Sequence, residues 1–416
     1  MRVITNPMFK NSKLFKLLGP GLITGASDDD PSGIITYLQA GVILGFKSLW
    51  SALLTIPLMY AVQEMCGRLG MVTGQGLLRL LKNNYPKLLV YTIAFAACSA
   101  MIINLGADLL AIGVVMEKLT NINRLLWLIV AAGLILFLLF KFSYHKIAHI
   151  LKWLTLSLFA YVATVFAIKI NWWQTIGQTF TPALPDTAMG WLIISAILGT
   201  TISPYLFFWQ AGEEAEEKKF KHITVTKHEL KNLHEDTFLG MLFSNVVMWF
   251  ILVGAAHLAQ NEGLTLITNF DQAALVLEPL LGSAAYLMFA LGIIGTGLLA
   301  IPVLAGATGY IAAELFNWPE GLGKPYRRTR GFHFTIIIAT ILGILLTLLG
   351  FDPVDLLIKT AIIYAILTPI LIFLIIRLSN NKKIMGDKTT QPIINILGYL
   401  ALFIILGVLL VPLIFY

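Results

Sequence analysis

Long apolar stretches alternate with short polar segments along nearly the whole chain of 416 residues. A helix that crosses a bilayer needs about 20 mainly apolar residues, and about eleven stretches come near that length. The chain is therefore expected to be an all-α polytopic membrane protein with eleven transmembrane helices. The expected spans are 17–43, 48–67, 90–116, 125–143, 152–169, 190–211, 237–259, 284–314, 333–350, 354–377 and 392–415.

Two of these stretches are interrupted by proline. The first contains Pro31, which is followed by Ser32 and Gly33, and the sixth contains Pro204, which follows Ser203. A pair of broken helices at corresponding positions of two halves is typical of secondary transporters built from inverted repeats. We therefore expect a single transmembrane transport domain that covers 1–416. Its first five-helix repeat spans about 17–169, its second about 190–377, and 392–415 adds a further helix.

The charge pattern supports a membrane location and argues against a nucleic-acid partner. Only 12% of the residues are charged, against about 25% in an average soluble protein, although the net charge is +7. Lys and Arg recur in alternate loops, from Lys10, Lys13 and Lys16 before the first span to Arg327 and Arg328 before the ninth. Because positive loops stay on the cytoplasmic side, this pattern predicts a cytoplasmic N-terminus and an external C-terminus. The expected location is the inner (plasma) membrane of a bacterium, with the lipid bilayer as partner.

Three consecutive carboxylates lie inside the first apolar stretch, at Asp28, Asp29 and Asp30. Each carboxylate at the bilayer centre costs about 2.5–3.5 kcal/mol, so these groups are expected to line water or meet cations. Neighbouring residues lie about 100° apart on a helix, so the three cannot share one face. Asp30, beside the proline, is the best candidate for a site. Asp28 and Asp29 are expected to line the approach or to find a polar partner.

The two breaks offer oxygen donors and no soft ligand. Unwinding a helix frees backbone carbonyls, and the hydroxyls of Ser32, Thr200, Thr201 and Ser203 lie in or beside the breaks. Such an environment suits a hard cation such as Mg²⁺, Ca²⁺, Mn²⁺ or Na⁺. The ion is expected to be the transported substrate, and no resident cofactor is expected.

Several segments resemble the NRAMP family of divalent-metal transporters. GPGLITGASDDDPSGIITYLQAG is similar to the first helix of that family without a gap, and GRLGMVTGQGLLRLLKNNYP resembles the stretch that follows its second helix. GTTISPY stands where the family has its helix-six metal motif, and IMG at 384–386 is similar to a triplet after helix ten. The resemblance implies a LeuT-like fold of two five-helix inverted repeats with helices one and six broken. It also implies a transporter, not an enzyme.

The sequence departs from the family at residues that matter for metal choice. Where the family has Asp-Pro-Gly-Asn, this chain keeps Asp30 but ends the motif with Ser32 and Gly33, so the asparagine amide is lost. In helix six, Ser203 stands in place of a methionine and Tyr205 in place of a histidine, after Thr200. Losing the thioether should weaken discrimination against Mg²⁺ and Ca²⁺. These changes resemble the NRAMP-related magnesium transporters, so Mg²⁺ and Mn²⁺ are the expected ions.

Proton coupling is also expected to be lost. The resemblance places the family's proton-conducting Asp and Glu of helix three at Asn104 and Ala107, neither of which titrates near neutral pH. Asp108, one turn from Asn104, could replace them. We therefore expect uncoupled, potential-driven import of divalent metal ions.

Three alternatives stay open at this stage. The first is a proton-coupled Mn²⁺/Fe²⁺ symporter of the NRAMP type. The second is a sodium-coupled amino-acid carrier of the same architecture, although three acidic residues would repel a substrate carboxylate. The third, from another class, is an intramembrane Mg²⁺-dependent transferase, which would need a second acidic cluster that no other span contains.

Overall fold

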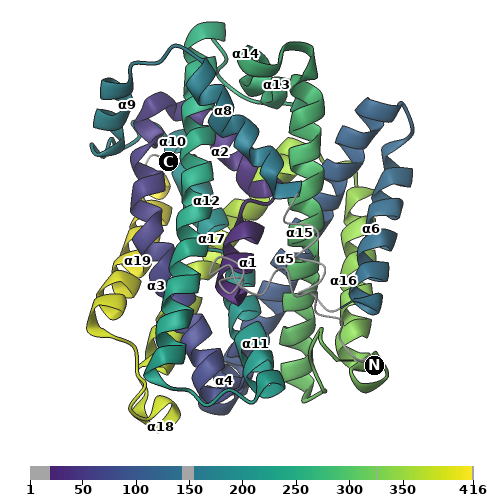
Figure 1. Ribbon diagram of the computed structural model, residues 1–416, viewed down its shortest axis with the longest axis vertical. Helices are drawn as coiled ribbons and strands as arrows, with labels where there is room; N and C mark the ends of the chain where they lie inside the picture. The colour runs from purple at the N-terminus through teal and green to yellow at the C-terminus, as the bar shows by residue number, and fades with distance from the viewer. Residues whose placement is uncertain (1–18, 143–153, 325, 415–416) are drawn as a thin grey trace, which may run out of the picture.

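The computed structural model describes residues 19–142, 154–324 and 326–414, and these residues form helices without any strand (Figure 1). Expectations that fall on residues 1–18, 143–153 and 415–416, including the orientation of the N-terminus, lie outside the described residues. The principal helices are α1 (Pro20–Asp28), α2 (Pro31–Leu44), α3 (Trp50–Thr73), α5 (Lys87–Thr120), α6 (Arg124–Lys141), α8 (Phe159–Ala167), α10 (Ala188–Thr201), α11 (Pro204–Lys221), α12 (Lys227–Glu262), α15 (Ala285–Phe316), α16 (Arg330–Thr347), α17 (Pro353–Ser379) and α19 (Pro392–Leu410).

Short helices connect the long ones at the two ends of the bundle. They are α4 (Leu77–Asn84), α9 (Trp172–Thr179), α13 (Phe270–Ala274), α14 (Glu278–Leu281) and α18 (Lys382–Met385). Brief 3₁₀ turns accompany them at Gly45–Ser48, Leu154–Leu158, Leu275–Leu277, Gly282–Ala284, Tyr326–Arg328 and Val411–Ile414.

The structure confirms a polytopic membrane protein. Within the described residues, eight helical segments are long and apolar enough to cross a membrane, or nine with the bent pair 31–48 and 50–73 taken as one span. The expected total of eleven stays a prediction. The difference arises because α1 and α2, the halves of the first span, are each shorter than a bilayer requires, and because only 156–167 of the fifth span forms a described apolar helix.

Both proline breaks are confirmed. In the first, α1 ends at Asp28 and α2 begins at Pro31, with extended backbone at Asp30 (φ −69°, ψ 172°). In the second, α10 ends at Thr201 and α11 begins at Pro204. Proline lacks an N–H and fixes φ near the helical value, so it interrupts the preceding ladder but fits the first position of a new helix.

The broken helices lie in the centre of the bundle, where α12, α15 and α17 surround them (Figure 1). α12 packs along both α1 and α2, and α17 packs along α10. Glycine permits the closest approaches. A Cβ added to Gly25 would lie 2.2 Å from the Gly240 carbonyl oxygen, and one added to Gly199 would lie 1.9 Å from that of Ala361. The breaks are therefore held tightly by their neighbours.

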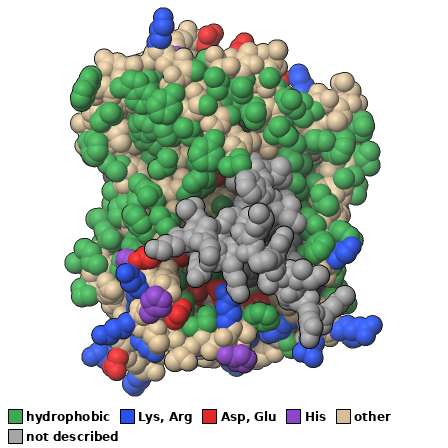
Figure 2. Space-filling view, viewed as in Figure 1, with side chains coloured by type: hydrophobic (Ala, Val, Ile, Leu, Met, Phe, Trp, Pro, Cys, Tyr) green, Lys and Arg blue, Asp and Glu red, His purple; other side chains and the backbone are tan. Residues whose placement is uncertain are grey.

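The surface has the division expected of a membrane protein. On the face shown in Figure 2, hydrophobic side chains cover most of the upper and middle parts, and charged side chains gather mainly at the lower end. Large apolar side chains are exposed on the outer helices, for example Phe95 on α5, with 77% of its surface accessible, and Phe403 on α19, with 66%. Such a continuous apolar surface fits contact with lipid chains.

Candidate metal site at the helix breaks

Asp30 caps the second half of the first broken helix. Its carboxylate accepts a hydrogen bond from the Gly33 amide at 2.7 Å, which satisfies one of the unpaired N–H groups at the start of α2. The side-chain amide of Asn104, on α5, donates to the other carboxylate oxygen at 2.9 Å. Only 1% of the surface of Asp30 is accessible. The carboxylate is thus sealed from both sides of the membrane and fixed by two donors.

A polar chain continues from Asn104 to α17. Thr360 donates to the side-chain carbonyl of Asn104 at 3.0 Å, and its hydroxyl lies 3.2 Å from that of Ser32. Ser32 donates in turn to the Leu357 carbonyl at 2.8 Å. Asp30, Ser32, Gly33 and Asn104 are therefore brought together.

Sequence reasoning missed Thr360, although α17 carried a signal. Thr360, Tyr364 and Thr368 recur every four residues and share one helix face. Thr368 donates to the Ile202 carbonyl at 3.0 Å, in the second break. This face of α17 thus contacts both breaks.

Asp108 lies one turn beyond Asn104 on α5 and is fully buried. Its carboxylate lies toward the amide of Ser32 and within electrostatic reach of Asp30, without a well-aligned hydrogen bond to any described residue. The hydroxyl of Tyr364, near both aspartates, is likewise buried and lies toward the side chain of Asn104. The α5 side of the break therefore contains a second carboxylate, that of Asp108, whose oxygens are available to a ligand.

Gly33 lies close to three oxygen atoms that would crowd a side chain. A Cβ added there would lie 3.1 Å from the Asp28 carbonyl oxygen, 3.4 Å from Oδ1 of Asp30 and 3.4 Å from the Tyr37 hydroxyl. Contacts of this length are tighter than ordinary van der Waals packing. A larger side chain at this position would therefore occupy space beside the Asp30 carboxylate.

At the second break, the hydroxyl of Ser203 donates only within its own segment. Ser203 donates its hydroxyl proton to backbone carbonyls of α10, those of Gly199 at 2.9 Å and Thr200. Within the described part of the chain, no hydrogen bond joins Ser203 or Thr200 to Asp30. Tyr205 connects the two breaks, because its hydroxyl donates to the Ser27 carbonyl at the end of α1 at 3.0 Å. The lone pairs of the Ser203 oxygen stay free to accept.

Asp28 and Asp29 face away from Asp30, toward α12. Ser244 Oγ lies 2.6 Å from Oδ2 of Asp28 and 3.2 Å from Oδ1 of Asp29. No three His, Cys, Asp or Glu side chains of the described residues are grouped so that they could hold a metal ion. The coordination shell of a cation at either break must therefore be completed by hydroxyl, amide or carbonyl oxygens, or by water.

Comparison with known proteins decides the family. The model of the family "Natural resistance-associated macrophage protein-like" (Nramp) matches residues 21–414. The chain belongs to this family. Nramp proteins are transporters, so the protein is a membrane transporter and not an enzyme.

The curated relatives of this Nramp chain match it over nearly its full length. The divalent metal cation transporter MntH of Erwinia tasmaniensis is 24% identical over 423 residues, which cover 98% of this chain and 96% of the relative. The protein of the same name from Klebsiella pneumoniae is 26% identical over 403 residues, which cover 92% and 90%.

Solved structures show the same fold. The Eremococcus coleocola manganese transporter, in complex with an aromatic bis-isothiourea compound, has a TM-score of 0.73 at 17% identity and covers 97% of this chain and 87% of its own. The inward-facing conformation of Mhp1 has a TM-score of 0.51 at 12% identity and covers 94% and 90%. The expected LeuT-like, all-helical fold with broken helices one and six is thereby confirmed.

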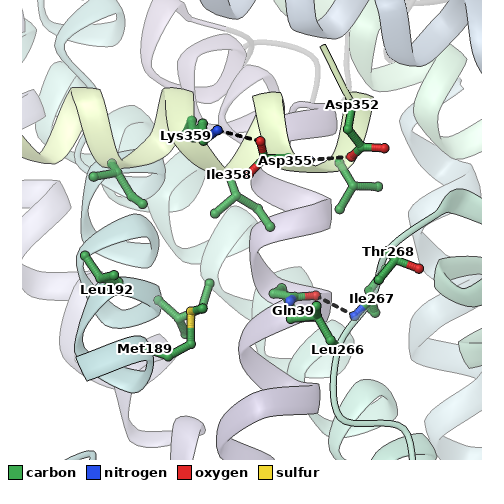
Figure 3. Close-up of a pocket in the computed structure, with 13 residues that line it drawn as sticks. Gln39, Met189, Leu192, Leu266, Ile267, Thr268, Asp352, Asp355, Ile358 and Lys359 are labelled. Atoms are coloured by element: carbon green, nitrogen blue, oxygen red, sulfur yellow. Dashed lines mark hydrogen bonds and ion pairs between the residues drawn. The ribbon is translucent and has the colours of Figure 1, made fainter. Parts of the chain in front are cut away.

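Two cavities flank the breaks of this Nramp protein, and neither is lined by Asp30. The first, of about 430 Å³, lies between α2, α10, α17 and the 266–268 segment, where Gln39 accepts from the Ile267 amide at 2.9 Å (Figure 3). Lys359 and Asp355, at its edge, form an ion pair at 2.6 Å. The other cavity, of about 640 Å³, lies beside the N-terminus of α1 and is lined by acidic side chains that include Glu214 and Asp236.

Proposed function

We propose that the protein imports divalent metal ions, Mg²⁺ and Mn²⁺, through an oxygen-lined site at Asp30, without coupling to protons. The observation that carries this proposal is the set of side chains around Asp30 that could bind or support a metal ion. The only described side chain that bonds to the Asp30 carboxylate is the Asn104 amide, and serine and threonine hydroxyls surround the pair. Hard oxygen donors without thioether or imidazole suit Mg²⁺ and Mn²⁺.

The oxygen atoms around Gly33 and the absence of a side chain there support a partly hydrated ion. Mg²⁺ gives up its waters reluctantly and usually keeps several of them when bound to protein. Three oxygen atoms, from Asp28, Asp30 and Tyr37, converge where a longer side chain would otherwise project. Water molecules around an ion at Asp30 can donate to such oxygens, so the missing side chain favours an ion that carries its hydration shell.

Asp108 supplies the second negative charge. With Asp30 it gives two carboxylates, which balance the charge of a divalent ion. In this proposal Asp30 is the direct ligand, with Ser32, Thr200, Ser203 and Gly33 around the ion. Asn104, Asp108 and Tyr205 form the outer layer, and Asp28 and Asp29 lie on the approach.

The two hydrogen bonds of Asn104 support transport without proton coupling. Its amide donates to Asp30 while its carbonyl accepts from Thr360, so a group that cannot titrate fills the position next to the ion ligand. The membrane potential is a sufficient driving force. A divalent ion gains about 4.6 kcal/mol from a potential of about 100 mV, which corresponds to a gradient of roughly 10³-fold.

The domain boundaries and the orientation are part of the same proposal. We place the first repeat at about 17–169 and the second at about 190–377, with 392–415 as an additional helix. The N-terminus is cytoplasmic and the C-terminus external, in a bacterial inner membrane. The location of the breaks, five spans apart, supports the repeats, and the basic loops support the orientation.

Uptake into proteoliposomes tests the function. Vesicles that contain a metal-sensitive dye and, in parallel, a pH-sensitive dye receive Mg²⁺ or Mn²⁺ under an inside-negative potential. Uptake of both ions without acidification supports the proposal. Mn²⁺ uptake with acidification, and none of Mg²⁺, would instead identify a proton-coupled Mn²⁺/Fe²⁺ symporter. Radiolabelled amino acids in place of metal test the carrier alternative, and Asp355→Asn, in an exposed ion pair outside the site, is the matched control.

A further inference from the structure

A second group of buried oxygens lies on the other side of the first break. Asp28, Asp29 and Ser244 meet where α12 packs against α1 and α2, whereas Asp30 bonds to Asn104 of α5. Asp28 and Asp29 both have 0% of their surface accessible. The break therefore presents one carboxylate toward α5 and two toward α12.

The two carboxylates are incompletely satisfied. A serine hydroxyl has a single proton, so Ser244 can donate to only one of them at a time. Oδ1 of Asp28 and Oδ2 of Asp29 have no hydrogen-bond partner among the described residues. None of the ion pairs in the described part of the chain involves either residue. Buried carboxyl groups are protonated, paired with a cation or bound to a metal, because desolvation of an unpaired charge is costly.

Tyr37 is an independent indication of a ligand. Its hydroxyl is fully buried and without a hydrogen-bond partner among the described residues. It lies back along α2 toward the break, because the Cβ position at Gly33 is 3.4 Å from this hydroxyl, 3.1 Å from the backbone carbonyl oxygen of Asp28 and 3.4 Å from Oδ1 of Asp30. Of the charged groups around it, Asp28 acts on it most strongly and Asp29 next. The Tyr37 hydroxyl, an unsatisfied donor and acceptor, thus lies within reach of Asp28 and Asp29, on the side of the break that also carries Asp30.

We propose that Asp28, Asp29 and Ser244 hold a second divalent cation, separate from the ion at Asp30, with Tyr37 in contact with that ion or its water. The proposal rests on the proposed function in that the cation is the same hard divalent metal. Two carboxylates balance its charge, and two uncommitted carboxylate oxygens and a hydroxyl supply oxygen ligands, which is the donor type that Mg²⁺ and Mn²⁺ take.

The location assigns this ion a place on the route through the protein. α12 follows α1 from Asp236, which bonds to Gly19 and Gly21, to Gly240, which packs on Gly25, and then to Ser244. Asp236 and Gly19 line the 640 Å³ cavity. The second cation therefore sits between Asp30 and this cavity, along the surface where α1 meets α12.

Counting bound Mn²⁺ tests the second site. The full chain, in lipid nanodiscs, is equilibrated with Mn²⁺ alone, bound metal is measured by dialysis and atomic emission, and spin–spin broadening in the EPR spectrum reports two ions close together. We expect two ions per chain in the wild type and in the Asp355→Asn control. We expect one in Asp28→Asn/Asp29→Asn and one in Asp30→Asn, without broadening.

The outcomes separate this proposal from the proposed function. One ion in the wild type, lost in Asp30→Asn and kept in the double variant, would overturn the second site and leave the proposed function standing. No bound ion would overturn both. Loss of both ions in a folded double variant would mean one shared site and would also overturn the proposal. Ser244→Ala, which keeps all carboxylates, should weaken only the second ion several-fold. Unchanged affinity for both ions in this variant would count against the assignment.

Discussion

The side-chain amide of Asn104 joins Asp30 to Thr360: it donates to the aspartate at 2.9 Å and accepts from the threonine at 3.0 Å. The link connects three helices, because Asp30 lies at the break between α1 and α2, Asn104 on α5 and Thr360 on α17. An amide in this position holds the Asp30 carboxylate without carrying a charge or a proton of its own. The residue that faces the ion, Asp30, is therefore a carboxylate, whereas the residue that holds it in place, Asn104, is a neutral amide.

Asp30→Asn should abolish metal transport. The substitution keeps the size of the side chain but removes the negative charge that directly faces the ion. We expect Mg²⁺ and Mn²⁺ uptake at the level of empty liposomes, while Asp355→Asn transports like the wild type. Uptake at wild-type rates in a correctly inserted Asp30→Asn protein would show that the ion does not depend on this carboxylate.

Asn104→Asp should make metal binding release protons. Two carboxylates about 3 Å apart cannot both be charged without a cation, so they share a proton until one arrives. Addition of Mn²⁺ should then release more protons into a weakly buffered solution of the variant than into one of the wild type, because the variant has one more buried carboxylate at the ion. The matched control is Asn104→Ala, which removes the same bond but adds no carboxylate. Equal proton release from the wild type and the variant would show that a carboxylate at position 104 does not share a proton with Asp30.

Gly33→Asn should narrow the site and favour Mn²⁺ over Mg²⁺. The new Cβ would press on oxygens of Asp28, Asp30 and Tyr37 at 3.1–3.4 Å, and its amide would take space that waters of a hydrated ion need. Mg²⁺ holds its water more tightly, so its uptake should fall more than that of Mn²⁺. Competition between the two ions for uptake measures the ratio. An unchanged ratio would indicate that the ion binds away from Gly33.

Ser203→Met should shift selectivity in the same direction for a different reason. A thioether adds a soft ligand, which Mn²⁺ tolerates better than Mg²⁺ or Ca²⁺ does. The hydroxyl bonds of Ser203 are confined to its own break, so the substitution should leave the Asp30 contacts in place. Inhibition of Mn²⁺ uptake by Mg²⁺ and Ca²⁺ gives the measurement, with Ser203→Ala as the control that removes the hydroxyl only. If both variants retain wild-type inhibition, the second break does not face the ion.

The sequence predicted the breaks well because a proline acts locally. Pro31 and Pro204 each remove a backbone donor and restart a helix, so their effect could be predicted from neighbouring residues alone. Asp30 followed from its position beside such a break. The partners could not be predicted in this way. Ser244 lies 216 residues from Asp28 and Thr360 lies 256 from Asn104, and each is a small polar residue with no local feature that marks it as a partner.

The contact between Asp236 and the N-terminus of α1 could not be predicted from the sequence for the same reason. Asp236 lies at the polar end of α12, among other charged residues, and nothing local distinguishes it from a solvated side chain. In the structure it is buried and bonds to the amides of Gly19 and Gly21, at 3.1 and 2.7 Å. A carboxylate at a helix N-terminus also interacts favourably with the helix dipole. Only the packing of α1 on α12 reveals this contact.

Asp236→Asn should release the N-terminal end of α1 from α12. The amide has one acceptor oxygen and no charge, so at least one charge-assisted bond is lost, which is worth about 1.5–3 kcal/mol, or roughly 10–100-fold in the opening equilibrium. Ser27→Cys, in a background with Cys66→Ala and Cys98→Ala, places a buried thiol at the far end of α1. Its alkylation by a membrane-impermeant reagent should accelerate in Asp236→Asn but not in Asp271→Asn, an exposed control on α13. Equal rates in the two variants would mean that Asp236 does not hold α1 against α12. Other contacts would then control the opening of the 640 Å³ cavity beside α1.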